Sequence, residues 1–147
     1  MARVDFAFGA PNRLQTACEV VYRHYQAGHP LVVYSSNTDQ LARFDNLLWS
    51  FQPEVFIPHC LSDDPALPEC RVALTDQSPI AAVWANVPPD TVWLLNLDDE
   101  CPETAEQFQR ILEIVSTDGP DVQPARQKWV QYKEKGHALH AHDISAR

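Results

Sequence analysis

Glycine is scarce in this chain: only 4 of its 147 residues are glycine, against 12 prolines. Neither GxGxxG nor GxxxxGKS or GxxxxGKT occurs, and the segment Gly9-Ala10-Pro11-Asn12, which follows the first expected strand, holds a single glycine. A phosphate-binding loop needs glycines so that its backbone can approach the phosphates closely. The sequence therefore argues against a nucleotide-binding enzyme.

Long hydrophobic runs are also missing. No apolar run approaches the roughly 18 residues of a membrane-spanning helix, so we expect no membrane span. Met1 to Asp5 lacks the apolar core of a signal peptide, so we expect none. The four cysteines (Cys18, Cys60, Cys70 and Cys101) are scattered without a CxxC pair. We therefore expect reduced thiols, no structural metal site and a cytoplasmic protein.

Positive charge is the third shortage. Lysine and arginine number 11 against 20 aspartates and glutamates, for a net charge of -9. Residues 1–119 hold 6 basic and 17 acidic side chains, whereas residues 120–147 hold 5 basic and 3 acidic ones. An acidic body repels phosphate groups, which argues against nonspecific binding to duplex DNA. The C-terminal segment is the one place that favours an anionic partner, with an ordinary solvated helix as the alternative.

The patterns that are present alternate between strand and helix. Expected strands cover residues 3–9, 31–34, 55–57, 71–75 and 91–97. Expected helices cover residues 12–27, 41–48, 102–112 and 121–135, and residues 112–116 could instead be a strand. Residues 76–90 fit neither pattern, and residues 137–147 are expected to be a polar, histidine-rich tail whose order the sequence leaves open. The order of elements predicts a single α/β domain over residues 1–147, with a largely parallel sheet and helices on both faces. The fold is expected to be Rossmann-like without a phosphate-binding loop.

Two clusters offer conceivable catalytic or metal chemistry. Asp98–Glu100 follow the clearest strand, at the end where α/β active sites usually lie. A solvated loop is the alternative, because no second set of ligands is evident. His137, His140 and His142 could each ligate a metal, but neither helical nor extended spacing brings the three together. We therefore expect no metal site and no catalytic residue.

Two other segments carry features of binding surfaces. In residues 47–59, one helix stripe cannot bury Trp49, Phe51 and Phe56 together with two leucines, so exposed rings are expected to meet a partner. The alternative is that these rings cover the sheet edge of the same chain.

The last expected helix carries the second surface. Its apolar residues recur at helical spacing: Val122, Ala125, Trp129 and Tyr132. Arg126, Trp129 and Lys133 also share a face. Cations beside a large ring suit a ligand that has both a carboxylate and an apolar side chain. A core tryptophan flanked by solvated charges is the alternative.

These segments resemble the chi subunit of bacterial DNA polymerase III holoenzyme, and the similarity extends over essentially the whole chain. It is carried by Leu47-Leu48-Trp49 with Phe56-Ile57-Pro58-His59, by Trp93-Leu94-Leu95-Asn96-Leu97, and by Ala125-Arg126-Gln127-Lys128-Trp129 with Tyr132-Lys133 and Gly136. Val122-Gln123-Pro124 depart from the family pattern, which often has another basic residue there.

The resemblance implies a non-catalytic accessory subunit of the clamp-loader complex that needs no cofactor. Members of this family bind the psi subunit and also the acidic C-terminal tail of single-stranded DNA-binding protein, which ends in Pro-Phe. They reach DNA only through these proteins, and some also associate with a DNA-repair helicase. The remaining alternatives are an α/β enzyme that uses Asp98–Glu100 and a stand-alone peptide-binding regulatory domain.

The resemblance also implies which residues serve each partner. For psi these are Trp49, Phe56, Pro58 and His59. For the acidic tail they are Arg126, Trp129, Lys133, Val115, Tyr132 and Lys128. In this second set, Arg126 is expected to bind the terminal carboxylate, and Val115, Trp129 and Tyr132 are expected to surround the phenyl ring. Lys128 and Lys133 are expected to attract the acidic residues of the tail.

Overall fold

The computed structural model describes all residues except 1, 53–56, 62, 63, 65–69, 85, 86, 118, 146 and 147. The strands in the described residues are β1 (Arg3–Ala10), β2 (Leu31–Tyr34), β3 (His59–Leu61), β4 (Val72–Thr75), β5 (Trp93–Asn96), β6 (Arg110–Ser116) and β7 (Ala138–Asp143). The α-helices are α1 (Arg13–Gln26), α2 (Thr38–Ser50) and α3 (Val122–Glu134). All seven strands are parallel and form one sheet in the order β3-β4-β2-β5-β6-β1-β7. The expected α/β fold is confirmed.

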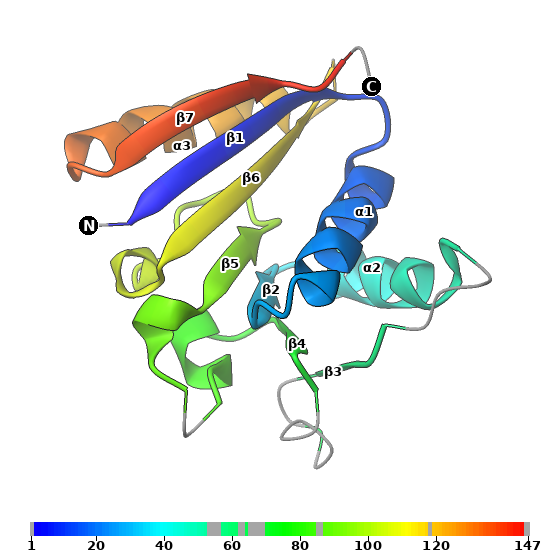
Figure 1. Cartoon of the computed structure of the whole chain (residues 1–147). Coiled ribbons are helices and arrows are strands. Elements are labelled where there is room, and N and C mark those ends of the chain that lie inside the picture. Colours follow the sequence, from blue (N-terminus) through cyan, green and yellow to red (C-terminus); the bar gives the residue numbers. More distant parts are fainter. Residues whose placement is uncertain are drawn as a thin grey trace.

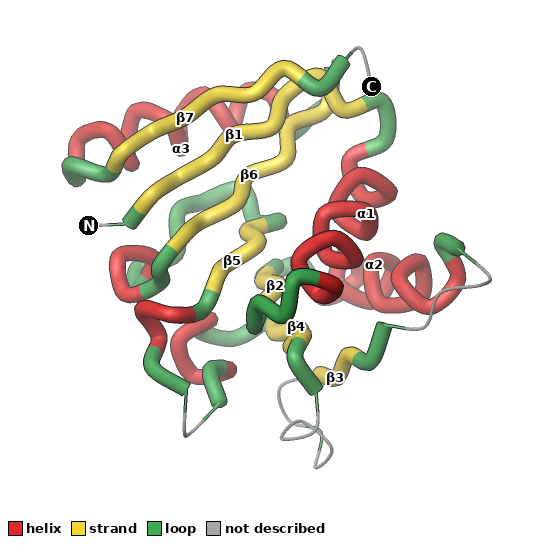
Figure 2. The backbone as a smooth tube through the Cα atoms, in the orientation of Figure 1, coloured by secondary structure: helices red, strands yellow, loops and turns green. Residues whose placement is uncertain are grey.

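The helices lie on both faces of this sheet, with α1 and α2 on one face and α3 on the other (Figures 1 and 2). Alternation along the strands produces two apolar cores. On β1, Val4 and Phe6 point toward α3, whereas the core under α1 and α2 contains Leu31 and Val33 of β2. The two layers therefore place α2 and α3 on opposite faces of the sheet.

Both helices of the first layer begin where a side chain can cap them. Asn12 accepts a hydrogen bond from the backbone N–H of Gln15 at 3.2 Å, and Asn37 accepts one from Gln40 at 3.1 Å. These bonds satisfy backbone donors that have no partner within the first turn. The helix expected after Asn12 is thus confirmed.

The helix expected over residues 102–112 is wrong. Only Ala105–Gln107 form a short 3-10 helix, and Arg110–Ser116 form β6. This strand lies between β5 and β1, and Ile111 to Val115 are buried on both of its faces. A strand covered on both faces has no alternating polar pattern, so its apolar run resembles a helical one.

The tail expected over residues 137–147 also needs correction. Gly136 adopts a φ of 83° after α3, and the chain then turns back to form β7 parallel to β1. His137 is buried, and its Nδ1 accepts a hydrogen bond from the backbone N–H of Ala2 at 3.0 Å. Pairing with β1 therefore orders this polar segment although most of its side chains remain exposed.

The expectation that all four cysteines are reduced differs from the structure, in which Cys60 of β3 is paired as a disulfide with Cys70, two residues before β4. Cys18 and Cys101 are free, and burial raises the pKa of Cys18 to about 12. Residues 55 and 56 of the strand expected over residues 55–57 lie outside the described residues. The described part of residues 76–90 contains the 3-10 helix Pro79–Ala82 and the start of another, Pro89–Thr91. No described helix is long and apolar enough to cross a membrane.

Candidate binding surfaces

Helix α3 presents two faces with different chemistry. Ala125, Lys128 and Tyr132 are buried against the sheet, whereas Arg126 and Lys133 are exposed. Trp129 is half-buried at the boundary between the faces. This division follows the 3.6-residue period of the helix, which places positions three and four residues apart on one side.

A pocket of about 690 Å³ opens beside Trp129, between α3 and strands β1, β6 and β7. Its walls include Phe6, Phe8, Val115, Arg126, Trp129 and Asp143. The ring of Trp129 packs edge-to-face against Phe6, with 5.1 Å between ring centroids. Phe8 is 41% exposed, so part of the apolar wall faces solvent. The pocket is thus an apolar cavity whose lining includes Arg126, Trp129 and Val115.

Lys128 and Tyr132 do not line this pocket, which corrects their expected places. Lys128 is 2% exposed, and its Nζ donates to Oε1 of Glu113 at 2.6 Å and to the Asp98 carbonyl at 2.7 Å. The Tyr132 hydroxyl donates to Oε2 of Glu113 at 2.7 Å, and Asn96 donates to the same oxygen. Burial and the Glu113 charge raise the pKa of Tyr132 far above its usual range. Both residues therefore anchor α3 to the sheet from below.

The carboxyl ends of β1 and β6 form the point where a doubly wound sheet usually binds ligands, because the two strands lead to helices on opposite faces. Side chains occupy this point here. Arg13 donates from Nε to the Ile114 carbonyl at 2.8 Å and lies 3.6 Å from Asp121. Asp121 also accepts a hydrogen bond from the backbone N–H of Ser116 at 2.8 Å. Although burial alone raises it, the bonds from Ser116 and the charge of Arg13 lower the pKa of Asp121.

The second surface lies at the end of α2. Trp49 is 46% exposed, and its ring lies over the ring of His59 with 4.0 Å between centroids. His59 is buried, with Nδ1 2.8 Å from the Ile57 carbonyl and Nε2 2.8 Å from Oδ1 of Asp45. The buried histidine therefore supports the exposed tryptophan from beneath.

Pro58 and Phe56 are the other two residues expected to bind psi. Pro58 is half-buried beside His59, whereas Phe56 lies outside the described residues. Sequence reasoning missed Asp45, although it lies four residues before Trp49 on α2, a spacing that places both on one helix face. It also missed Leu61, which is 45% exposed on the edge strand β3.

The acidic and histidine clusters contact other parts of the chain. Asp98 accepts a hydrogen bond from the Ser36 backbone N–H at 3.0 Å, which ties the loop after β5 to the loop after β2. His142 lies 2.8 Å from Asp5, whereas His137 faces Ala2. Among the described residues, no three histidine, cysteine, aspartate or glutamate side chains are placed to hold a metal ion together.

The Arg126 pocket and the Trp49 surface lie at opposite edges of the sheet, where β7 and β3 are the outer strands (Figure 1). Strands β4, β2, β5, β6 and β1 lie between the two edges.

The whole chain is similar to known proteins. Residues 1–140 match the family described as DNA polymerase III chi subunit, HolC. The chain is 31% identical over 150 residues to DNA polymerase III subunit chi of Pseudomonas aeruginosa, with 98% of each chain covered. It is 24% identical over 133 residues to the subunit of the same name from Haemophilus influenzae, with 88% of this chain and 86% of the relative covered.

Proposed function

Since this chain belongs to the DNA polymerase III chi subunit family, we propose that it is a non-catalytic subunit that bridges two other replication proteins. The psi subunit binds the Trp49 surface, and the acidic tail of single-stranded DNA-binding protein binds the Arg126 pocket. The chain thereby connects the clamp-loader complex to coated single-stranded DNA without touching DNA itself. It acts in the cytoplasm as one domain over residues 1–147.

The observation that carries this proposal is the division of charge on α3. Lys128 is neutralised by buried Glu113, whereas Arg126 is exposed and makes no ion pair with any described residue. Arg126 is therefore available to fork a ligand carboxylate, a contact that is stronger than a neutral hydrogen bond. The cavity beside Trp129 receives the phenyl ring next to that carboxylate, and exposed Lys133 attracts the acidic residues before it.

The Trp49 surface supports a different type of contact. An exposed tryptophan held against a buried ring is a rigid apolar anchor, and such residues dominate the energy of protein interfaces. Leu61 extends the exposed apolar area at this edge. We assign this surface to psi because the resemblance implies Trp49, Pro58 and His59: Trp49 is exposed, Pro58 is half-buried, and the buried His59 supports Trp49 from beneath.

An active site at Asp98–Glu100 is disfavoured. Asp98 bonds to the Ser36 loop, and Asp99 and Glu100 are exposed rather than gathered around a cavity. The point between β1 and β6 is occupied by Arg13 and Asp121. In the described residues, these contacts therefore favour a binding function over a catalytic one.

A titration tests the tail assignment. An acidic peptide ending in Pro-Phe is expected to bind the full chain, and more weakly as salt increases because exposed charges are screened. Arg126→Ala is expected to weaken binding by about 1.5–3 kcal/mol, the range for a hydrogen bond to a charged group. The matched control is Arg71→Ala, which removes an exposed arginine elsewhere.

A second peptide tests whether the terminal carboxylate is the group that Arg126 binds. With an amide in place of its terminal carboxylate, the peptide should bind wild type about as weakly as the acid binds Arg126→Ala. Equal affinity of both peptides for wild type would contradict the role of Arg126. No binding of the acid peptide would remove the tail from the proposed function.

A further inference from the structure

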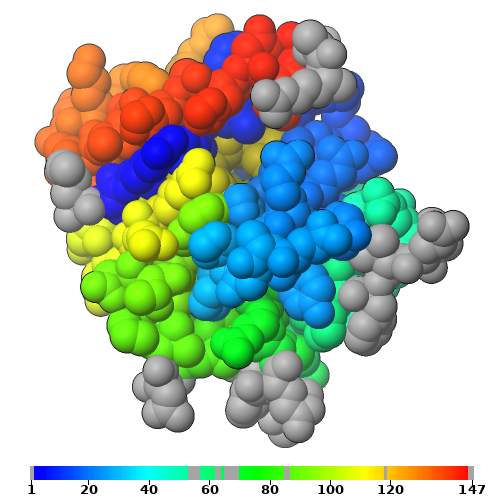
Figure 3. All heavy atoms as spheres, in the orientation of Figure 1, coloured from blue at the N-terminus to red at the C-terminus, as the bar shows by residue number. Residues whose placement is uncertain are grey.

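β7 is an outer strand of the sheet, with β1 on one side and no described strand on the other. Figure 3 shows β7 (red) at the rim of the molecule beside α3 (orange). Proteins commonly block such an edge with lysine, proline, a bulge or a very short strand. Residues 138–143 contain no lysine or proline, and their pairing with β1 is unbroken. The other outer strand, β3, has only three residues, so β7 is the longer open edge.

The hydrogen bonds at the two ends of β7 show which backbone groups face this edge. The N–H of Ala138 donates to the Ala2 carbonyl at 3.3 Å, and the N–H of Ile144 donates to the Phe8 carbonyl at 2.9 Å. Between these bonds the register with β1 is continuous. In a parallel pair, successive residues direct their N–H and C=O groups to opposite edges of the strand. The residues of β7 that direct these groups outward are therefore Leu139, Ala141 and Asp143.

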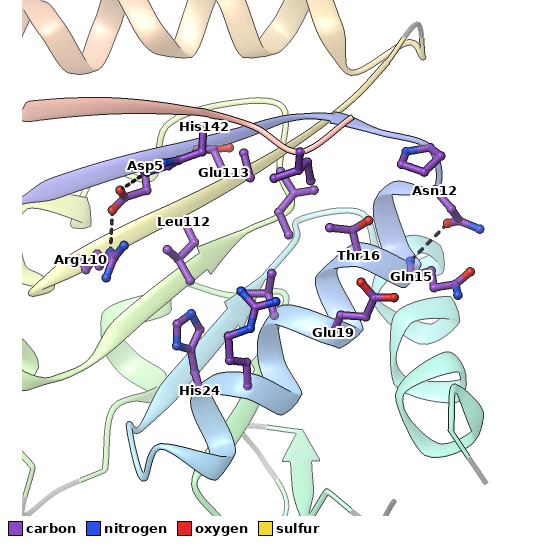
Figure 4. Close-up of a pocket in the computed structure, with 16 residues that line it drawn as sticks. Asp5, Asn12, Gln15, Thr16, Glu19, His24, Arg110, Leu112, Glu113 and His142 are labelled. Carbon is purple, nitrogen blue, oxygen red and sulfur yellow. Dashed lines mark hydrogen bonds and ion pairs between the residues drawn. The ribbon is translucent and has the colours of Figure 1, made fainter. Parts of the chain in front are cut away.

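Contacts within the chain hold β7 in place against β1. On the sheet face that carries α1, Nε2 of His142 lies 2.8 Å from Oδ1 of the buried Asp5 (Figure 4). Just before the strand, His137 is buried against the backbone of Ala2. A strand that is already fixed loses little conformational entropy when a peptide pairs with it, and such preorganisation favours binding.

The Arg126 pocket opens at the carboxyl end of this edge. Ala141 and Asp143 of β7 line the pocket together with Ser145, and Arg126 and Trp129 of α3 line its other side. A tail whose last residue occupies the pocket therefore ends beside the carboxyl end of β7. If the tail is followed back along the open edge from that point, its chain runs in the same direction as β7. This direction continues the parallel sheet.

Net charge does not select the ligand of this edge. The exposed cations Arg126 and Lys133 of α3 are offset by the exposed acids Glu134 and Asp143. The Asp143 carboxylate accepts hydrogen bonds from the Ser145 backbone N–H at 2.9 Å and hydroxyl at 2.7 Å. When a peptide adds a strand to a sheet, backbone hydrogen bonds supply affinity and side-chain pockets supply specificity. The pocket can therefore select the last residue, while the edge binds the backbone of the residues before it.

We propose that the residues preceding Pro-Phe in the acidic tail of single-stranded DNA-binding protein add an eighth strand to the sheet, parallel to β7. Their backbone groups bond to those of Leu139, Ala141 and Asp143, and the terminal phenylalanine turns onto the α3 face and into the Arg126 pocket. The proline, which has no N–H, lies at the end of the added strand, a position that strands tolerate. This inference rests on the proposed function of the pocket and extends that site to the edge of β7.

Amide hydrogen exchange, measured by NMR on the full chain, tests the added strand. One probe is an acidic peptide that ends in Pro-Phe and is long enough to span β7, and the other is acetyl-Pro-Phe, which reaches only the pocket. With the long peptide at saturation, exchange at Leu139, Ala141 and Asp143 is expected to slow by about tenfold or more, because open amides become hydrogen-bonded. The amides of His140 and His142, which face β1, are the matched controls and should change less. Acetyl-Pro-Phe should leave the outward amides unprotected.

The outcomes separate this inference from the proposed function. If the long peptide binds through Arg126 but leaves the three outward amides unchanged, the added strand is wrong and the pocket assignment stands. If acetyl-Pro-Phe protects these amides as well as the long peptide does, the added strand is also wrong. If the long peptide does not bind at all, both the pocket assignment and the added strand are wrong.

Methylation of backbone nitrogens in the peptide supplies a second measurement. On a strand, only alternate amides face the neighbouring strand. Methylation of an amide that faces β7 is expected to weaken binding by about threefold or more because it removes a hydrogen bond. Methylation of the next amide along the peptide should leave the affinity nearly unchanged. Equal effects at adjacent positions overturn the proposal. So does protection of the outward amides that rises with the concentration of the free chain, which would indicate a second copy at this edge.

Discussion

The Trp49 surface and the Arg126 pocket use tryptophan in opposite ways. Trp49 stands on a buried histidine and exposes 46% of its surface. Trp129 is half-buried against Phe6 and forms a wall beside an exposed arginine. Under the proposed function, the first arrangement is an anchor for a partner, whereas the second is a cavity for a side chain of the acidic tail.

The two proposed contacts therefore depend on different physical forces. An apolar anchor depends on area removed from water and is only weakly sensitive to salt. A pocket that recognises a carboxylate among acidic residues depends on exposed charge and weakens as salt increases. If both proposed contacts form, salt should weaken the second far more than the first.

The largest expected effect concerns the foundation of the pocket. Glu113→Gln removes the charge that neutralises Lys128 inside the protein, where an unpaired ammonium costs about 3–5 kcal/mol. We expect the free energy of unfolding, measured in urea, to fall by this amount, whereas Arg126→Ala changes it by less than about 0.5 kcal/mol.

The double variant Glu113→Gln with Lys128→Met provides the control. It removes both charges and keeps a side-chain oxygen for Tyr132, so most of the lost stability should return. If the double variant is no more stable than Glu113→Gln, the buried ion pair does not hold α3 to the sheet.

The next effect concerns the anchor. Trp49→Ala is expected to weaken psi binding by about 2 kcal/mol or more, as for a central interface tryptophan. The tail peptide should bind this variant as it binds wild type. Gln131→Ala is the control because it trims an exposed residue of α3 outside the pocket lining. Co-purification with psi and peptide titration give the two readouts. Loss of peptide binding in Trp49→Ala would contradict the independence of the two surfaces.

The smallest effect is a pH dependence at the edge of the pocket. The folded-state pKa of Asp121 lies below its unfolded value, so its stabilising contribution is complete above about pH 4 and is lost as the pH falls through the folded value. In Asp121→Asn, the free energy of unfolding should therefore fall less in this acid range than in wild type, by about 1 kcal/mol or less. If the stability of the variant fell with pH as much as that of wild type, the Ser116 and Arg13 contacts of Asp121 would contribute nothing to stability.

The sequence predicts the fold more fully than it predicts the pocket. Asn12 and the alternating residues of β1 are local signals, so the first helix and strand follow from them. The identity of β6 depends on neighbours on both sides, which no local pattern reveals. For the same reason β7 reads as a polar tail, because its order comes from pairing with β1.

Lys128 illustrates what the sequence cannot supply at the site. It lies three residues after Ala125 and four before Tyr132, and that spacing already places it on the buried face. Its charge nevertheless indicates a solvated position. Lys128 can be buried only because Glu113 of β6, directly beneath α3, accepts a hydrogen bond from its ammonium group. Phe8 and Asp143 enter the pocket because β1 and β7 pair, and no motif in the sequence links these two strands.

The central claim is that the two surfaces act at the same time on one chain. Its most direct test is a titration of the acidic Pro-Phe peptide into the purified complex of this chain with psi. The account predicts that the affinity matches that of the free chain and that psi stays bound at saturation. Displacement of psi by the peptide, or loss of peptide binding in the complex, would contradict the bridge.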